Sequence, residues 1–178
     1  MSKEKNRHMH LALFGLMAII VITMAIGYPA APAEAETLKA KVTNYSVKLE
    51  YVPAGDVQGH VIGLDVREGN AVFDDGQTAK YAMVSTFDFM AGKGGTTSGY
   101  TKMTFKDDSF IMFKWAAEAG IDPDKLSTSK GTGTITSGGG RYRGIKGSVS
   151  FAGKGTKPSS EDPKREMVIN AVIDYTLP

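Results

Sequence analysis

Apolar and polar residues alternate with a period of two through most of the chain after residue 36. The clearest run is residues 81–90, in which every second side chain is apolar or small and faces one side. Residues 167–177 alternate just as regularly. A period of two is the pattern of a β-strand with one buried face. No segment in this part of the sequence shows the period of a long amphipathic helix, so the pattern predicts an all-β domain.

The alternation slips in phase within the first predicted strand. Even-numbered positions up to Val42 carry the apolar side chains, and odd-numbered positions from Tyr45 to Tyr51 carry them afterwards. We therefore expect a bulge near Asn44, which keeps both sets on the buried face. This register turns Glu50 away from that face, and a bulge at another position would turn it inward.

The next strand is predicted to begin at His60, which shares one face with three aliphatic side chains up to Val66. Gly69 and Asn70 are frequent turn residues, so we expect the chain to turn there and to form a short strand over residues 71–73. If the face of His60 is the buried one, its imidazole lies inside the domain or at its mouth.

Turn-forming or polar residues separate the predicted strands, in residues 74–76, 92–99, 106–109 and 154–165. Roughly seven or eight strands at spacings of about eight to twelve residues are typical of an antiparallel barrel or sandwich. A barrel is the better prediction because closure removes exposed strand edges. The predicted fold is thus all-β, a single closed antiparallel eight-stranded barrel.

Residues 1–35 have the organisation of a secretory signal peptide. Basic residues lie within the first seven positions, an apolar run of 17 residues spans 11–27, and small residues precede the expected cleavage after Ala35. We predict a signal peptide of residues 1–35 and a barrel domain of residues 36–178, exported to the periplasm or secreted. An uncleaved membrane anchor is the alternative, because the apolar run is only slightly shorter than the roughly 20 residues of a membrane span.

The predicted mature domain is nearly neutral, with 18 Lys plus Arg against 17 Asp plus Glu. This balance argues against nucleic acid as a partner, because binding phosphates needs a basic excess on one face. The chain contains no cysteine, so no disulfide stabilises it. A membrane contact is expected only through the N-terminal segment, if that segment is retained.

Standard catalytic machinery is missing from the predicted mature domain. His60 is its single histidine, and the chain has no cysteine and no G-x-S-x-G motif, so a Ser–His–Asp or Cys–His enzyme has little to build on. A zinc site would need several His or Cys ligands. The paired aspartates at 74–75 and 107–108 lie in predicted turns and lack the spacing of a calcium loop. No metal and no cofactor are therefore predicted.

The most distinctive stretch is residues 131–155, in which glycines surround a single aromatic corner. Its spacing is Gly138-x-Gly140-x-Tyr142-x-Gly144-Ile145-x-Gly147. This spacing resembles the G-x-G-x-aromatic-x-G-aliphatic-x-G corner of allene oxide cyclases and, more loosely, that of dirigent proteins. The resemblance is close over about ten residues and is a matter of pattern elsewhere. It implies an eight-stranded antiparallel barrel with a hydrophobic cavity.

The resemblance also suggests candidate catalytic residues. Allene oxide cyclases use a glutamate on an early strand and a bound water inside an apolar cavity that restrains the substrate, and Glu50 is in the comparable place. His60 is the other candidate, provided that its face points inward. Aromatic side chains are expected to line the interior, either around a ligand or as simple core. They are Tyr81, Phe87, Phe89, Tyr100, Phe113, Trp115 and Tyr175.

Three functions stay open at this point. The first is an exported barrel that binds a small hydrophobic molecule in its interior. The second is a cofactor-free cyclase or isomerase, as the resemblance to allene oxide cyclases implies, with Glu50 or His60 as its polar group. The third is a filled barrel that acts through its surface, as a possible homodimer or homotrimer. An open apolar cavity would favour the first two, because a filled barrel has none.

Overall fold

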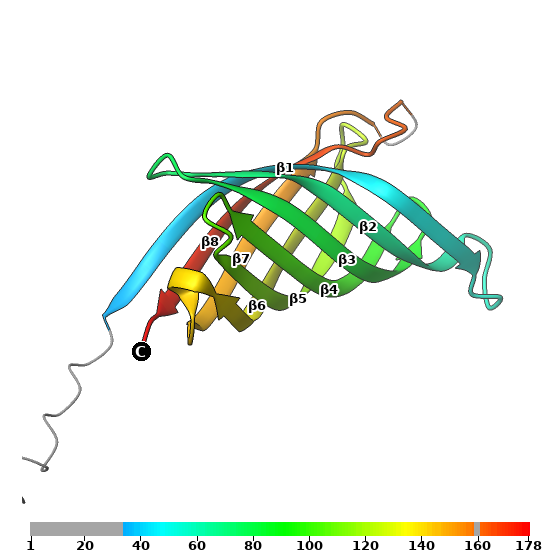
Figure 1. Cartoon of the computed structure of the whole chain (residues 1–178). Helices are drawn as coiled ribbons and strands as arrows, with labels where there is room; N and C mark the ends of the chain where they lie inside the picture. The colour runs from blue at the N-terminus through cyan, green and yellow to red at the C-terminus, as the bar shows by residue number, and fades with distance from the viewer. Residues whose placement is uncertain (1–33, 159–160) are drawn as a thin grey trace, which may run out of the picture. The chain divides into compact units, whose positions relative to one another are not determined.

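The computed structural model describes residues 34–158 and 161–178, which form a closed antiparallel barrel of eight strands (Figure 1). The strands are β1 (Ala35–Pro53), β2 (His60–Phe73), β3 (Thr78–Met90), β4 (Gly94–Phe105), β5 (Phe110–Ile121), β6 (Ser127–Gly139), β7 (Lys146–Gly155) and β8 (Met167–Thr176). Each strand pairs with its neighbours in sequence, and β8 pairs with β1. The predicted fold class is confirmed. The proposed signal peptide falls almost entirely on residues outside the described part, and β1 begins at Ala35.

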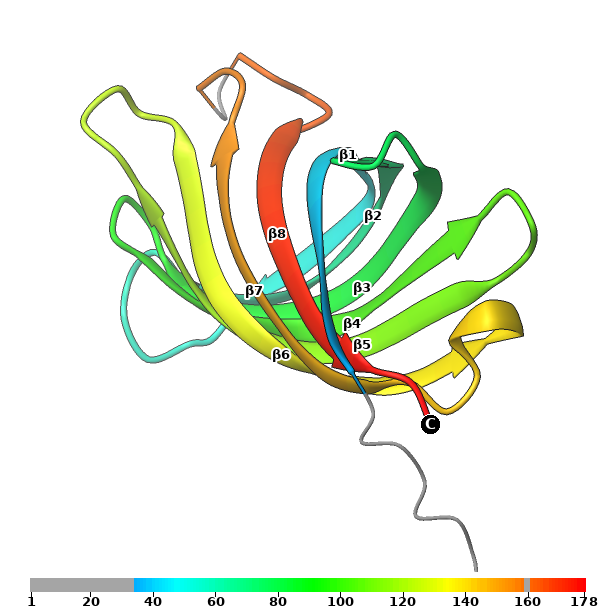
Figure 2. The ribbon, with the colours of Figure 1, turned by 90° about the vertical axis from the view of Figure 1, so that its left-hand side faces the viewer.

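The barrel wall follows the chain order without a crossover. Turned by 90°, Figure 2 shows β6, β7 and β8 side by side in the wall, with β1 next to β8. The alternation along β3 and β8 is as predicted, since Tyr81, Met83 and Phe87 on one strand and Ile173 on the other are buried. The core therefore lies on the inner faces of the strands.

One end of the barrel is filled by aromatic side chains, here called the closed end: Phe73, Phe105, Tyr142 and Tyr175. Phe105 stacks on Phe73 with ring centroids 5.2 Å apart, and its other neighbour is Tyr142 at 5.0 Å. Tyr142 in turn meets Tyr175 edge to face at 6.0 Å. Such aromatic pairs stabilise a core beyond the area that they bury. The closed end is thus a packed plug.

The glycine corner positions one ring of this plug. A 3-10 turn, η1 (Gly140–Tyr142), follows β6, and Gly140 has a φ of +62°, which glycine adopts without strain. A Cβ at Gly138 would lie 2.4 Å from the carbonyl oxygen of Tyr142, so only glycine allows this close return of the chain. Tyr142 is 4% exposed as a result. Gly144 and Gly147 complete the motif on the way into β7.

The predicted bulge exists, but its position was predicted wrongly. Asn44 continues the inward alternation and is fully buried. The register of β1 against β2 shifts between Ser46 and Lys48, so the extra residue is Val47. Tyr45 consequently faces solvent, with 37% of its surface exposed, instead of the interior.

The predicted turn at Gly69 is also wrong, because β2 runs through it as one continuous strand. A Cβ at Gly69 would lie 2.0 Å from the carbonyl oxygen of Thr43, so this glycine serves a close approach between β1 and β2. The predicted loop over residues 92–99 is wrong for the same reason. Its glycines were interpreted as turn residues, but β4 begins at Gly94. Glycines inside these strands mark tight backbone packing and not chain reversal.

Candidate functional site

The barrel encloses a cavity of about 540 Å³. Its lining reaches the connections between β1 and β2, β3 and β4, and β7 and β8 through Gly59, Gly92 and Lys157, and it borders the connection between β5 and β6 at Ile121, the last residue of β5. These four connections lie at the end opposite the aromatic plug, and we call this end the mouth. The volume is within the usual range for sites that bind small molecules.

The wall of the cavity is mostly apolar. Its larger apolar side chains are Val42, Leu49, Tyr51, Val61, Tyr81, Met83, Phe87, Phe89, Met90, Met103, Phe113, Trp115, Ile121, Val149, Phe151, Met167 and Ile169. The Trp115 ring meets Phe151 edge to face at 5.6 Å, and its indole Nε1 donates a hydrogen bond to Thr101 Oγ1 over 3.0 Å. Burial raises the pKa of Tyr81, so its hydroxyl remains neutral in this wall.

Two of the aromatic side chains predicted for the interior do not line the cavity. Tyr100 faces outward and is 45% exposed, because the inward positions of β4 are those of Thr101 and Met103. Tyr175 is buried, but it belongs to the closed end, where its hydroxyl donates to Glu36 Oε2 over 2.6 Å. The remaining predicted residues, Tyr81, Phe87, Phe89, Phe113 and Trp115, are all part of the lining.

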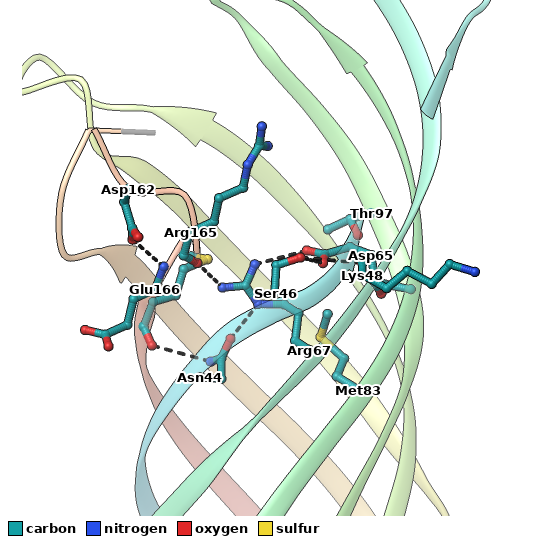
Figure 3. A network of polar contacts seen from close by, with 12 residues as sticks. Asn44, Ser46, Lys48, Asp65, Arg67, Met83, Thr97, Asp162, Arg165 and Glu166 are labelled. Atoms are coloured by element: carbon teal, nitrogen blue, oxygen red, sulfur yellow. Dashed lines mark hydrogen bonds and ion pairs between the residues drawn. The ribbon is translucent and has the colours of Figure 1, made fainter. Parts of the chain in front are cut away.

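An ion pair between the buried Arg67 and the partly buried Asp65 interrupts the apolar wall, and Figure 3 shows the polar contacts around it. Arg67 Nη1 donates to Asp65 Oδ2 over 3.0 Å, and both residues line the cavity. The Arg67 side chain is 7% exposed and that of Asp65 is 15% exposed. Arg67 Nε donates to Asn44 Oδ1 over 2.6 Å, and Ser46 Oγ donates to Asp65 Oδ1 over 2.6 Å. Unpaired charges would be unstable at such burial, and this network holds them in place.

The network retains hydrogen-bonding capacity. A guanidinium has five N–H donors. Within the described residues, Arg67 directs one donor each to Asn44, Asp65 and the carbonyl oxygen of Arg165. These contacts leave two N–H groups of Arg67 and further lone pairs of the Asp65 carboxylate unused, and both residues line the cavity. Because the pair as a whole is neutral, it suits a polar group without requiring a charged one.

The same network secures the connection between β7 and β8 at the mouth. Besides the bond from Arg67 to the carbonyl of Arg165, the Ser46 backbone N–H donates to the Lys164 carbonyl over 2.8 Å. The Asp162 carboxylate accepts backbone bonds from Glu166 over 2.5 Å and from Lys164 over 3.0 Å. These hydrogen bonds lower the pKa of Asp162, and the bond from Glu166 makes the largest contribution. One side of the mouth is thus fixed to the wall of the cavity.

Neither predicted catalytic residue lies in the cavity. Glu50 is on the outer face of β1, where its carboxylate lies 3.2 Å from Lys48 Nζ and is 65% exposed. The bulge at Val47 sets this orientation, so an inward Glu50 carboxylate is ruled out. His60 also faces outward, because the inward positions of β2 are those of Asp65 and Arg67. The two candidates are therefore not brought together.

The residues that sequence reasoning missed are Asp65 and Arg67. The sequence contained a signal for them. Ala71 and Phe73 mark the buried face of β2, and Asp65 and Arg67 occupy odd-numbered positions of this strand as they do. Had the strand been continued through Gly69, this parity would have turned both charged residues inward. The predicted turn at Gly69 divided β2 into two strands. The aliphatic side chains that follow His60 then favoured the even-numbered positions of the first of these strands as the buried face.

Within residues 34–158 and 161–178, no group of three or more His, Asp or Glu side chains is arranged so that it could hold a metal ion. Over the same residues, no helix has the length and apolarity to cross a membrane.

Comparison with known proteins gives a likeness of fold. The pterocarpan synthase dirigent protein GePTS1 is similar with a TM-score of 0.48 and 10% identity, over 86% of this chain and 99% of that chain. The pterocarpan synthase dirigent protein PsPTS1 gives a TM-score of 0.44 and 12% identity, over 80% of this chain and 95% of that chain. No family model and no curated sequence matches. Both structures are dirigent proteins, one of the two families that the glycine corner resembles, and at TM-scores below 0.5 and identities of 10% and 12% they carry no further argument about this chain.

Proposed function

We propose that the barrel binds a small, largely apolar molecule in its cavity, with a polar group of that molecule at Asp65 and Arg67. The observation that carries the proposal is a cavity of about 540 Å³ with a mostly apolar wall and the ion pair of Arg67 with Asp65 in its lining. Sites for small molecules combine a mostly apolar surface with a few placed polar groups. The volume argues against a filled barrel that acts only through its surface.

Export would place this uptake outside the cytoplasm. The proposal of export rests on the signal-like pattern of residues 1–35. A ligand taken up there would enter through the mouth, because aromatic side chains fill the other end of the barrel.

A cyclase or isomerase is the second candidate, and the ion pair in the cavity is the observation that favours it. Chemistry on a bound substrate needs a polar group within reach of it. With Glu50 and His60 on the outer surface, Asp65 and Arg67 would have to supply that group. Turnover that is lost in Asp65→Asn while binding survives would separate the enzyme from the binding protein.

Binding can be tested with the neutral apolar dye N-phenyl-1-naphthylamine on the full-length protein. Trp115 is the single tryptophan and lies in the cavity wall, so energy transfer from it to the dye reports occupation of the interior. We expect saturable transfer that is lost in Trp115→Phe, while dye emission on binding persists.

A matched pair of variants locates the dye. Ala119→Phe narrows the cavity, because Ala119 lines it, whereas Ala116→Phe on the same strand points to solvent. We expect Ala119→Phe to weaken binding by roughly tenfold, which corresponds to about 1.4 kcal/mol, and Ala116→Phe to leave it unchanged. Equal effects of the two substitutions, or no saturable binding by the unmodified protein, would overturn the proposal.

A further inference from the structure

His60 lies between two carboxylates on the outer surface at the mouth. Its Nδ1 is 2.7 Å from Asp56 Oδ1, and its Nε2 is 2.7 Å from Asp88 Oδ1. Asp56 belongs to the connection between β1 and β2, and Asp88 belongs to β3. The imidazole therefore bridges two separate elements.

Only the protonated ring can make both bonds at once. An ionised carboxylate accepts hydrogen bonds and cannot donate them, so each ring nitrogen must carry a proton. A neutral imidazole has one N–H, and its other nitrogen would face a carboxylate with a lone pair. The bond with Asp88 first, and then that with Asp56, raises the pKa of His60 above its ordinary value of 6.5. The geometry and the direction of the shift agree.

This bridge is continuous with the rim of the cavity. Gly59 directly precedes His60, and the Ala91 backbone N–H donates to the Gly59 carbonyl over 2.9 Å. Gly59 and Ala91 both line the cavity. The Ala54 backbone N–H donates to the His60 carbonyl over 3.0 Å, which closes the connection onto the start of β2. Loss of the side-chain bridge would loosen one side of the mouth.

In the described residues, His60 forms ion pairs only with Asp56 and Asp88. Across the outer face, Asp88 pairs with Thr96 and Thr96 pairs with Glu118, which places the Glu118 carboxylate two strands beyond Asp88. Lys93 lies in the turn after β3. On the β1 side, the Glu50 carboxylate is paired with Lys48. In the described part of the chain, Asp56 and Asp88 are the charged groups that shift the pKa of His60.

We propose that Asp56, His60 and Asp88 form a pH-dependent latch, which holds the connection between β1 and β2 against the end of β3 and slows ligand exchange through the mouth. The proposal rests on ligand binding in the cavity. Because the pKa of folded His60 is raised, the latch is complete below the ordinary histidine value and is lost as the pH rises through the folded value. The lowered pKa of Asp56, caused first by its bond to His60, keeps that carboxylate charged over this range.

The test measures the rate at which N-phenyl-1-naphthylamine leaves the full-length protein, from about pH 5 to about pH 8. The dye stays neutral, so its own charge does not change. We expect dissociation to accelerate by about fivefold as the pH rises, near the low end of typical coupling between sites. His60→Gln should dissociate at the fast rate at every pH, and Asp88→Asn should move the transition to lower pH. His8 and His10 are present in the unmodified protein and in both variants, so any effect of their titration on the rate is the same in all three.

A dissociation rate that does not change with pH, in a protein that binds the dye, overturns the latch and leaves the cavity proposal intact. A pH dependence that persists in His60→Gln overturns it too. If the dye does not bind, the proposed function fails, and the latch is then judged by hydrogen exchange of the Ala91 amide. Its protection should fall with rising pH in the unmodified protein and stay low in His60→Gln. Equal protection of the two proteins at all pH values would refute the latch.

Discussion

Trp115 donates its indole N–H to Thr101 Oγ1 over 3.0 Å, from β5 to the neighbouring β4, and Thr101 is 1% exposed. A buried indole N–H without an acceptor is unfavourable. This bond therefore fixes the orientation of the tryptophan in the cavity wall, where it serves as a reporter of the interior.

Thr101→Val should lower the free energy of unfolding by about 1–2 kcal/mol, because valine keeps the shape of threonine and removes the acceptor of the Trp115 N–H. Urea denaturation followed by tryptophan fluorescence measures the change. Thr96→Val is the control, since Thr96 lies exposed on the same strand and should change stability by less than about 0.5 kcal/mol. Equal losses in the two variants would contradict a specific role for the bond.

Arg67→Met should destabilise the barrel by about 3 kcal/mol, because it leaves the partly buried Asp65 carboxylate without its ion-pair partner and removes the donors to Asn44 and Arg165. Adding Asp65→Asn to this variant should restore part of the loss, since the uncompensated charge is then removed. Urea denaturation of the single and double variants gives both values. Lys114→Met on the outer face of β5 is the control and should be nearly neutral.

Gly69→Ala should cost more than about 2 kcal/mol, because the added methyl would lie 2.0 Å from the Thr43 carbonyl oxygen and the two strands would have to separate. Asn70→Ala, at the next position and exposed, should have little effect. Thermal and urea unfolding of the two variants measure both changes in the free energy of unfolding. A neutral Gly69→Ala would show that the close approach of β1 and β2 is not needed for stability.

Asp162 should contribute stability that depends on pH. Its pKa is lowered from 3.8 by backbone bonds from Glu166, Lys164 and Arg165, so its contribution is complete above the unfolded value and is lost as the pH falls through the folded one. The difference in unfolding free energy between the unmodified protein and Asp162→Asn should therefore be constant near neutral pH and shrink in acid. A difference that stays constant down to the lowest pH would argue against an ionised Asp162.

Much of this barrel follows from local pattern. The strict alternation in residues 81–90 and 167–177 predicted β3 and β8 with the correct inner faces, since a period of two is set by the strand itself. The glycine corner predicted the eight-stranded architecture through its resemblance to known barrels. These features depend only on residues that are close in sequence, so they can be predicted from the sequence alone.

The location of the chemistry depended on contacts between distant residues. Whether Asp65 and Arg67 face the cavity is decided by the continuity of β2 through Gly69, which depends on the approach of Thr43 from another strand. The outward position of Glu50 depends on the exact residue of the bulge, Val47, which is fixed by pairing with β2. A shift of one residue reverses every side chain of a strand. The sequence by itself thus determined most of the strands and the closed fold, and only the tertiary structure decided which polar groups lie inside, because that choice is made by register between strands.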